Sequence, residues 1–171
     1  MMPRVNFRWN SRNRYSIAAL GAVLDFGLVD KPEDGIMLYS FASPQAPRVF
    51  KEVRSAGTGS IFIAGGPHPS GRPEETLEFF DYVVMGEGEE TLPELIKTLT
   101  EGGDVSTVRG VAYKDNGKVV FTPRRGEVDL DRYPPFKPPL FGPIEITRGC
   151  PWGCTYCQTP KLFGPHMRHR S

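Results

Sequence analysis

Short apolar runs alternate with helical stretches through the first 105 residues, and this alternation constrains the fold more than any other feature. Runs of β-branched and aromatic residues predict strands, and apolar residues spaced three or four apart predict helices between them. Strands that are apolar almost throughout are typical of a parallel sheet covered on both faces. The expected strands are 4–9, 36–41, 60–64 and 82–85, and the expected helices are 15–26, 44–56, 73–80 and 89–99. The sequence therefore predicts an α/β fold with a small doubly wound, Rossmann-like parallel sheet.

Residues 108–122 come next and have the pattern of a β-hairpin. Two alternating runs flank the turn sequence Asp115-Asn116-Gly117. Six prolines between positions 123 and 143 then predict an extended linker, and the run 144–147 predicts a new strand. We therefore expect three parts, which are an α/β domain with its terminal hairpin at 1–123, a Pro-rich linker at 124–142 and the start of a second domain at 143–171.

Two glycine motifs follow expected strands, at the edge where doubly wound folds bind their ligands. Gly65-Gly66-Pro67-His68 follows the third strand, and Gly86-Glu87-Gly88-Glu89 follows the fourth. A cofactor site would use the glycines of both motifs, His68 and Glu87. A tight turn that needs glycine freedom explains the first motif equally well. A helix start with acidic residues in its first turn explains the second motif better than ligand contact does.

Charge and hydropathy exclude several classes of function. The chain has 21 Lys and Arg against 20 Asp and Glu, a formal net charge of +1. This balance argues against a dedicated nucleic-acid-binding protein. No apolar run approaches the roughly 18 residues that a membrane helix needs, and the first residues contain no signal-peptide core. We therefore expect a cytoplasmic protein without a membrane or nucleic-acid partner.

The three cysteines of the chain, Cys150, Cys154 and Cys157, stand close together. In a reducing compartment an odd, clustered set indicates metal or redox chemistry rather than disulfides. The spacing i, i+4 and i+7 lets one loop place three thiolates around an iron–sulfur cluster. Three ligands for a [4Fe-4S] cluster leave one iron open, and an open position is how a metal centre binds a substrate.

The segment from Thr147 to Cys157, Thr-Arg-Gly-Cys-Pro-Trp-Gly-Cys-Thr-Tyr-Cys, resembles the cluster motif of radical S-adenosylmethionine (SAM) enzymes. The motifs Gly65-Gly66-Pro67-His68-Pro69-Ser70 and Gly86-Glu87-Gly88-Glu89-Glu90-Thr91 resemble the subclass with an N-terminal cobalamin (B12)-binding-like domain. The resemblance implies such a domain, followed by the first strand and cluster loop of a partial (β/α) barrel. It also implies that this chain is the N-terminal part of a longer enzyme and is inactive alone.

The resemblance implies roles for individual residues and cofactors. The three cysteines would ligate the [4Fe-4S] cluster, and its open iron would bind SAM. A flavodoxin- or ferredoxin-type donor would supply the electron that cleaves SAM to a 5′-deoxyadenosyl radical. Tyr156 would shield the cluster and line the adenine side. Cobalamin would relay a methyl group if it binds, but the sequence lacks the Asp-x-His-x-x-Gly loop that supplies a cobalt ligand in methyltransferase-type domains.

Two further classes of function stay open at this point. A non-enzymatic module could hold zinc through the three cysteines and His166 or His169, and metal analysis would separate it from a cluster protein. A cobalamin carrier domain with an unrelated cysteine tail would show a cobalamin spectrum without iron. A methylthiotransferase is a variant of the main interpretation. Such enzymes usually carry further cysteines in their N-terminal domain, and residues 1–149 contain none.

Overall fold

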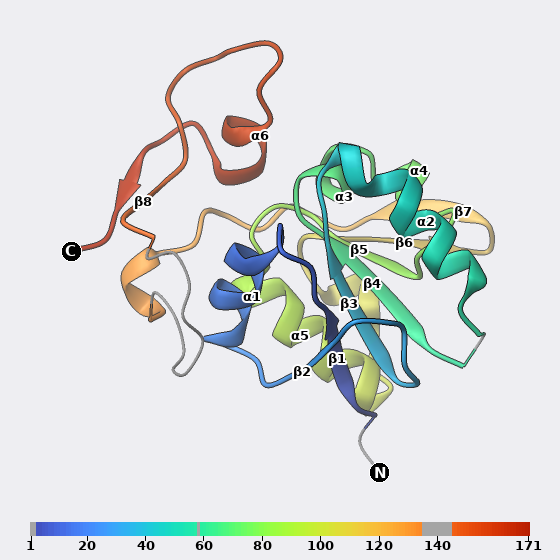
Figure 1. Cartoon of the computed structure of the whole chain (residues 1–171). Coiled ribbons are helices and arrows are strands. Elements are labelled where there is room, and N and C mark those ends of the chain that lie inside the picture. The colour runs from blue at the N-terminus through green and yellow to red at the C-terminus, as the bar shows by residue number, and fades with distance from the viewer. Residues whose placement is uncertain (1–2, 58, 135–144) are drawn as a thin grey trace.

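The computed structural model describes residues 3–57, 59–134 and 145–171, and its main feature is a seven-stranded sheet (Figure 1). The strands run in the order β2-β1-β3-β4-β5-β6-β7, with β1 to β5 parallel and β6 and β7 antiparallel. The strands of this sheet are β1 (Val5–Arg8), β2 (Gly27–Val29), β3 (Ile36–Ser40), β4 (Ile61–Gly65), β5 (Tyr82–Val84), β6 (Val111–Asp115) and β7 (Lys118–Phe121). The predicted hairpin therefore extends the parallel sheet instead of standing apart from it.

Helices surround this sheet, and a short strand pair lies near the C-terminus. The helices are α1 (Arg14–Gly21), α2 (Ala46–Ser55), α3 (Pro67–Gly71), α4 (Pro73–Thr76), α5 (Gly88–Glu101) and α6 (Thr159–Phe163), with 3₁₀ turns η1 (Ser43–Gln45), η2 (Val105–Thr107) and η3 (Leu130–Arg132). The separate pair is β8 (Thr147–Arg148) and β9 (Arg168–His169), which run antiparallel. No helix in the described part of the chain is long and apolar enough to cross a membrane.

Helices cover both faces of the sheet, and β3 shows why this is necessary. All five residues of β3 are buried, and successive side chains point to opposite faces. Ile36 and Leu38 belong to an apolar cluster with residues of α1 and α5, whereas Met37 and Tyr39 belong to a second cluster with residues of α2. A strand that is apolar throughout needs cover on both sides. The predicted α/β fold with a doubly wound, Rossmann-like parallel sheet is confirmed.

The order of the first five strands places a crevice at one edge of the sheet. β1 and β3 are neighbours, but the helices that follow them, α1 and α2, lie on opposite faces. The chain therefore changes its winding direction between these two strands. In doubly wound folds this change opens a crevice beyond the carboxyl ends of the strands, where ligands bind.

The largest difference from the predicted elements lies between positions 15 and 29. The helix expected over 15–26 ends at Gly21, and a short strand that the pattern did not predict, β2, begins at Gly27. Leu24 and Phe26 still pack against the core, but from a loop. Gly27 is required for close contact rather than as a helix stop, since a Cβ there would lie 2.6 Å from the Asn6 side chain.

The region after the hairpin also differs from the extended linker expected at 124–142. Val128 and Leu130 are buried, and the Val128 amide donates to Glu87, so the described part, 124–134, contacts the α/β domain. The rest of the expected linker, and the start of the strand expected at 144–147, lie outside the described residues. The segment 145–171 also forms α6, which the sequence did not predict, and β8 pairs with β9.

Candidate functional site

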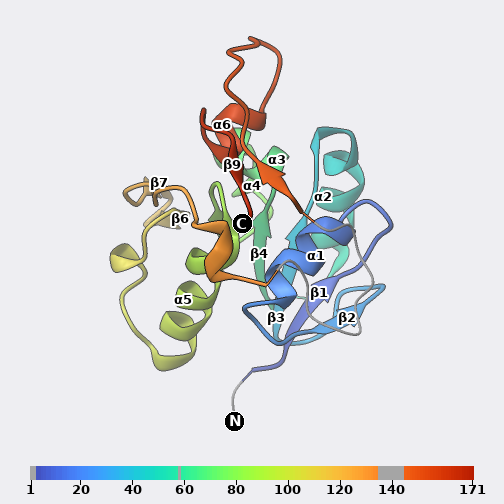
Figure 2. The same cartoon turned by 90° about the vertical axis from the view of Figure 1, so that its left-hand side faces the viewer.

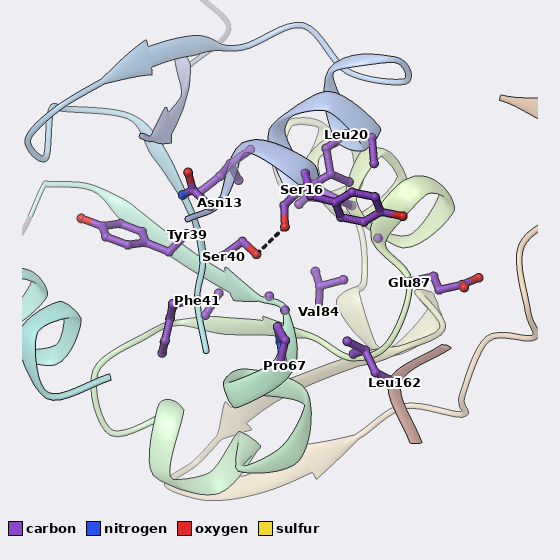
Figure 3. Close-up of a pocket in the computed structure, with 18 of the residues that line it drawn as sticks. Asn13, Ser16, Leu20, Tyr39, Ser40, Phe41, Pro67, Val84, Glu87 and Leu162 are labelled. Carbon is purple, nitrogen blue, oxygen red and sulfur yellow. Dashed lines mark hydrogen bonds between the residues drawn. The ribbon is translucent and has the colours of Figure 1, made fainter. Parts of the chain in front are cut away.

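A cavity of about 310 Å³ opens at the carboxyl edge of the sheet, in the crevice between β1 and β3 (Figure 3). Its walls are mainly apolar and include Leu20 from α1 and Val84 from β5. Leu162 and Phe163 of α6 complete the lining. The cavity is therefore walled both by the α/β domain and by the segment that carries the cysteines. A mainly apolar cavity with a few polar groups is the usual form of a small-molecule site.

Charged side chains and hydroxyl and amide groups supply the polar part of the lining, and the charged residues among them are Arg12, Glu87, Glu89 and Arg148. Ser40, at the end of β3, and Ser16, on α1, form a hydrogen bond with 2.8 Å between their Oγ atoms (Figure 3). One hydroxyl donates in this bond, so the accepting one keeps its hydrogen for a ligand. The Asn13 amide holds the loop after β1, because its Nδ2 donates to the Arg8 carbonyl and its Oδ1 accepts from the Asn10 amide.

The glycines of both predicted motifs line this cavity. Gly66 has φ +90°, and a Cβ there would lie 2.7 Å from Ser40 Oγ, so only glycine fits between β4 and α3. Gly65, Gly86 and Gly88 lie beside it in the lining. The turn interpretation of the first motif and its predicted place at a ligand site are thus compatible, since the same residue makes the turn and faces the cavity.

His68 lies apart from the lining of this cavity. It is 4 % exposed and stacks on Phe41, with ring centroids 5.5 Å apart. Its Nδ1 lies 3.1 Å from the Ser43 hydroxyl, and burial lowers its pKa. The structure therefore places His68 in the aromatic core next to the crevice, and no histidine is among the described residues that line the cavity.

Glu87 and Glu89, from the second glycine motif, are buried beside the cysteine segment and bind Arg148. The Arg148 guanidinium lies 3.3 Å from a Glu87 oxygen and 2.6 Å from a Glu89 oxygen. It also donates two hydrogen bonds, of 2.7 and 2.8 Å, to Glu145. Burial disfavours the charge on Arg148, but the bonds to Glu145 and the charge of Glu89 outweigh it and raise the pKa.

A second arginine completes this group, which we call the charge cluster and define as Glu87, Glu89, Glu145, Arg148 and Arg168. Arg168 donates to both oxygens of Glu87 and to the Val128 carbonyl. Glu87 also accepts a 2.6 Å hydrogen bond from the Val128 amide. Both oxygens of the Glu87 carboxylate are therefore bound by groups of the protein itself. The two arginines among these groups belong to the cysteine segment, so Glu87 joins the second glycine motif to that segment.

The cysteines lie on the loop between β8 and α6, which extends from the α/β domain (Figures 1 and 2). Cys154 is exposed, and Cys150 and Cys157 are half-buried. Hydrogen bonds from the Thr159 hydroxyl and amide lower the pKa of the Cys157 thiol, which favours the thiolate that binds metals. Tyr156 is 90 % exposed, so it shields no other described residue.

The described residues do not assemble a site for a single metal ion. Within residues 3–57, 59–134 and 145–171, no three His, Cys, Asp or Glu side chains converge closely enough to hold one ion. A zinc site with His166 or His169 is therefore not assembled. The ligation of a [4Fe-4S] cluster by the three cysteines stays a prediction from their spacing.

Comparison with known proteins agrees with this geometry. Residues 34–96, which include β3 to β5 and the first glycine motif, match the B12-binding domain model. An uncharacterized methyltransferase of Pyrococcus horikoshii is 32% identical over 154 residues, which are 80% of this chain and 33% of that protein. The chain is therefore similar to B12-binding domains over residues 34–96 and to a methyltransferase over most of its length. We refer to residues 3–134 as the B12-binding-like domain.

Two solved structures share the fold of the B12-binding-like domain and of the segment after it. The radical SAM methyltransferase TsrM of Kitasatospora setae has a TM-score of 0.70 at 17% identity, over 98% of this chain and 42% of TsrM. The cobalamin-dependent SAM radical enzyme OxsB has a TM-score of 0.70 at 20% identity, over 99% of this chain and 30% of OxsB. The chain spans about a third of the length of the Pyrococcus relative.

The sequence analysis did not identify several residues of the cavity and of the charge cluster. Ser40 was detectable, because it is a polar residue at the end of an otherwise apolar strand. Arg148 stands in the cysteine motif, but its role depends on carboxylates that are 59 and 61 residues away in sequence, Glu89 and Glu87. Arg168 carried no local signal, since only the folded chain brings it to Glu87.

Proposed function

We propose that this chain forms the cofactor-binding front part of a radical SAM methyltransferase. Cobalamin would bind at the carboxyl edge of the B12-binding-like domain, and a [4Fe-4S] cluster on Cys150, Cys154 and Cys157. The observation that carries the proposal is the shared cavity, whose walls come from the B12-binding-like domain and from Leu162 and Phe163 of the cysteine segment. A ligand in that cavity touches both parts of the chain.

The cavity residues would bind and orient the organic part of cobalamin. Leu20, Val84 and Leu162 present apolar surface that excludes water. The paired hydroxyls of Ser16 and Ser40 offer a donor at the base of the crevice. Gly66 lets the backbone approach a ligand without a side chain between them. The described lining contains no histidine, so this cavity supplies no imidazole ligand for cobalt.

The cysteine loop would hold the cluster through its three thiols. The lowered pKa of Cys157 favours the thiolate at that position. When bound, the cluster and SAM supply radical chemistry and cobalamin supplies methyl carriage. On this proposal an electron donor of the flavodoxin or ferredoxin type reduces the cluster in the cytoplasm. The contribution of the chain is to hold the two cofactors beside each other and to limit the access of water.

Metal and sulfide analysis of the full-length protein, purified without oxygen, tests the cluster. We expect about four irons and four sulfides per chain. The electron paramagnetic resonance signal of the reduced protein should change when SAM is added. One zinc without sulfide would overturn the radical SAM proposal.

An absorbance titration of the same protein with hydroxocobalamin tests the second cofactor. We expect saturable binding of one cobalamin per chain, and the cob(II)alamin formed on reduction should show no nitrogen hyperfine splitting from a histidine ligand. No binding would restrict the proposal to radical SAM chemistry without cobalamin. A splitting that isotope labelling assigns to a histidine nitrogen, and not to the benzimidazole of the cofactor, would show that a residue outside the described lining reaches the cobalt.

A further inference from the structure

The cysteine segment, residues 145–171, is joined to the B12-binding-like domain mainly by arginine side chains. Its backbone-to-backbone hydrogen bonds, including those of β8 with β9, stay within the segment in the described structure. One backbone amide, that of Ser171, donates to the Asp131 carboxylate of the domain. Arg148 and Arg168 bind carboxylates of the domain, and Arg170 donates to the carbonyls of Leu130 and Tyr133. The place of the segment on the domain therefore depends on these guanidinium groups.

Arg148 and Glu89 form one of the two most enclosed of these contacts, the other being Arg148 with Glu87. The Arg148 and Glu89 side chains are 3% and 6% exposed, and their closest atoms are 2.6 Å apart. A buried ion pair adds little stability compared with apolar residues of the same size, because both charges lose their hydration. Its directional bonds do fix one arrangement, since the planar guanidinium fork donates to carboxylates only along set directions. We therefore infer that the ion pair fixes the position of the cysteine segment and adds little to the free energy of unfolding.

The backbone from Arg148 to Cys150 links the position of the ion pair to that of the first cysteine. Gly149 has φ +90°, and a Cβ there would collide with the His166 carbonyl oxygen. The Cys150 amide donates a 3.3 Å hydrogen bond to the Gly164 carbonyl. The backbone between Arg148 and Cys150 is thus closely packed, so a shift of the guanidinium moves Cys150 with it.

We propose that Glu89 and Arg148 are positioning residues, whose ion pair sets the place of Cys150 relative to the cavity at the sheet edge. This inference rests on the proposed function, because it assigns the pair the task of fixing the distance between the cluster and cobalamin. It also gives the acidic residues of the second glycine motif a role that neither the helix start nor ligand contact supplies. Both side chains also line the cavity, so the pair joins the wall of the proposed cobalamin site to the cysteine loop.

Hydrogen–deuterium exchange on the metal-free, full-length protein tests the placement without any cofactor. Glu89→Gln keeps the shape of the side chain but removes its charge. We expect amide exchange over 146–152 to rise about tenfold, with exchange in β3 and β4 unchanged. Glu101→Gln, an exposed position on the same helix, is the matched control and should match the wild type. Equal exchange in both variants would overturn the proposal.

Pulsed electron paramagnetic resonance on the loaded protein separates positioning from stability. Arg148→Lys keeps the positive charge in the charge cluster but loses the guanidinium fork. Because Arg148 also lines the cavity, the protein is loaded with saturating hydroxocobalamin, and we expect iron and sulfide contents to stay at the wild-type level. The distance distribution between cob(II)alamin and the reduced cluster should broaden, and the methyl-transfer rate should fall about tenfold or more. An unchanged distribution and rate would show that any cation at this position suffices.

Failure of the proposed function and failure of this inference give different results. If the wild-type protein holds neither cofactor, the proposed function is wrong, and exchange over 146–152 still decides whether the pair places the cysteine loop. If the wild type holds both cofactors but Glu89→Gln exchanges like Glu101→Gln, the proposed function stands and the positioning role falls.

Discussion

The B12-binding-like domain and the cysteine segment meet at one cavity, but different forces hold them. The domain encloses two apolar clusters, one on each face of its sheet. In the described segment 145–171, the two buried residues are Glu145 and Arg148, and both are charged. Ile146 and Trp152 are exposed there. Apolar burial is the main source of folding free energy, so the domain has its own core, whereas the segment depends on directional contacts and on what it binds.

The largest expected effect is the loss of the cluster from Cys154→Ala, with the domain left intact. Cys154 is exposed and far from both apolar clusters, so its thiol contributes to ligation and little to folding. Iron content of the full-length variant should fall from about four per chain to near zero. The far-ultraviolet circular dichroism spectrum should match that of the wild type. A lost spectrum would show that the two regions are not independent.

The next largest effect is the difference in unfolding free energy between an apolar truncation in the domain and one in the cysteine segment. Leu95 of α5 is fully buried, and Leu95→Ala should lower the free energy of unfolding by about 2–5 kcal/mol, because it removes apolar contacts and leaves a cavity. Ile146, in the cysteine segment, is 68% exposed, and Ile146→Ala should change the free energy of unfolding by less than about 0.5 kcal/mol. Urea unfolding followed by circular dichroism measures both. Equal effects would break the comparison.

The fold of the domain was predictable because its signals are local. Each core strand is a short apolar run bounded by glycine or proline, so periodicity identified β1, β3, β4 and β5 within a residue or two. β2 was missed because its three residues are too few to show a period, and because its placement depends on Asn6. The short helix α3 was missed because Pro67-His68-Pro69 reads locally as a turn.

The candidate site was only partly predictable, for a different reason. Gly65, Gly66, Gly86 and Gly88 were placed at the correct sheet edge, since strand ends fix that edge. His68 could not be placed, because its burial depends on aromatic residues from other elements. Charge pairing between distant segments leaves no trace in a local pattern, so the charge cluster was invisible. The three cysteines stay a prediction that rests on their spacing.

Gly66 should show a smaller effect, on both the stability of the domain and the binding of a ligand in the cavity. Gly66→Ala must hold an alanine at φ +90°, with its Cβ 2.7 Å from Ser40 Oγ. We expect a loss of about 1–3 kcal/mol in the free energy of unfolding, together with weaker hydroxocobalamin binding. Gly65→Ala is the matched control, because its Cβ would meet nothing closer than 3.7 Å. If both variants bind and unfold alike, the close approach at Gly66 does not matter to the site.

His68 gives the smallest expected effect, which is a change of stability with pH that belongs to the domain alone. Burial lowers the pKa of its imidazole, with Arg72 acting in the same direction and Glu75 against them. The folded chain therefore binds this proton less readily than the unfolded chain, whose histidine titrates near about 6.5. The contribution of His68 to stability is complete above that pH and decreases as the pH falls through it.

His68→Phe removes this titration while keeping an aromatic ring against Phe41, and His169→Gln, an exposed histidine of the cysteine segment, is the control. Urea midpoints at about pH 7.5 and about pH 5.5 bracket the unfolded pKa. The decrease between these two pH values should be smaller in His68→Phe than in the wild type, and unchanged in His169→Gln. The same decrease in all three proteins would mean that protonated His68 is tolerated in the aromatic core. Apolar packing around His68 would then contribute less to the stability of the domain than its contrast with the cysteine segment implies.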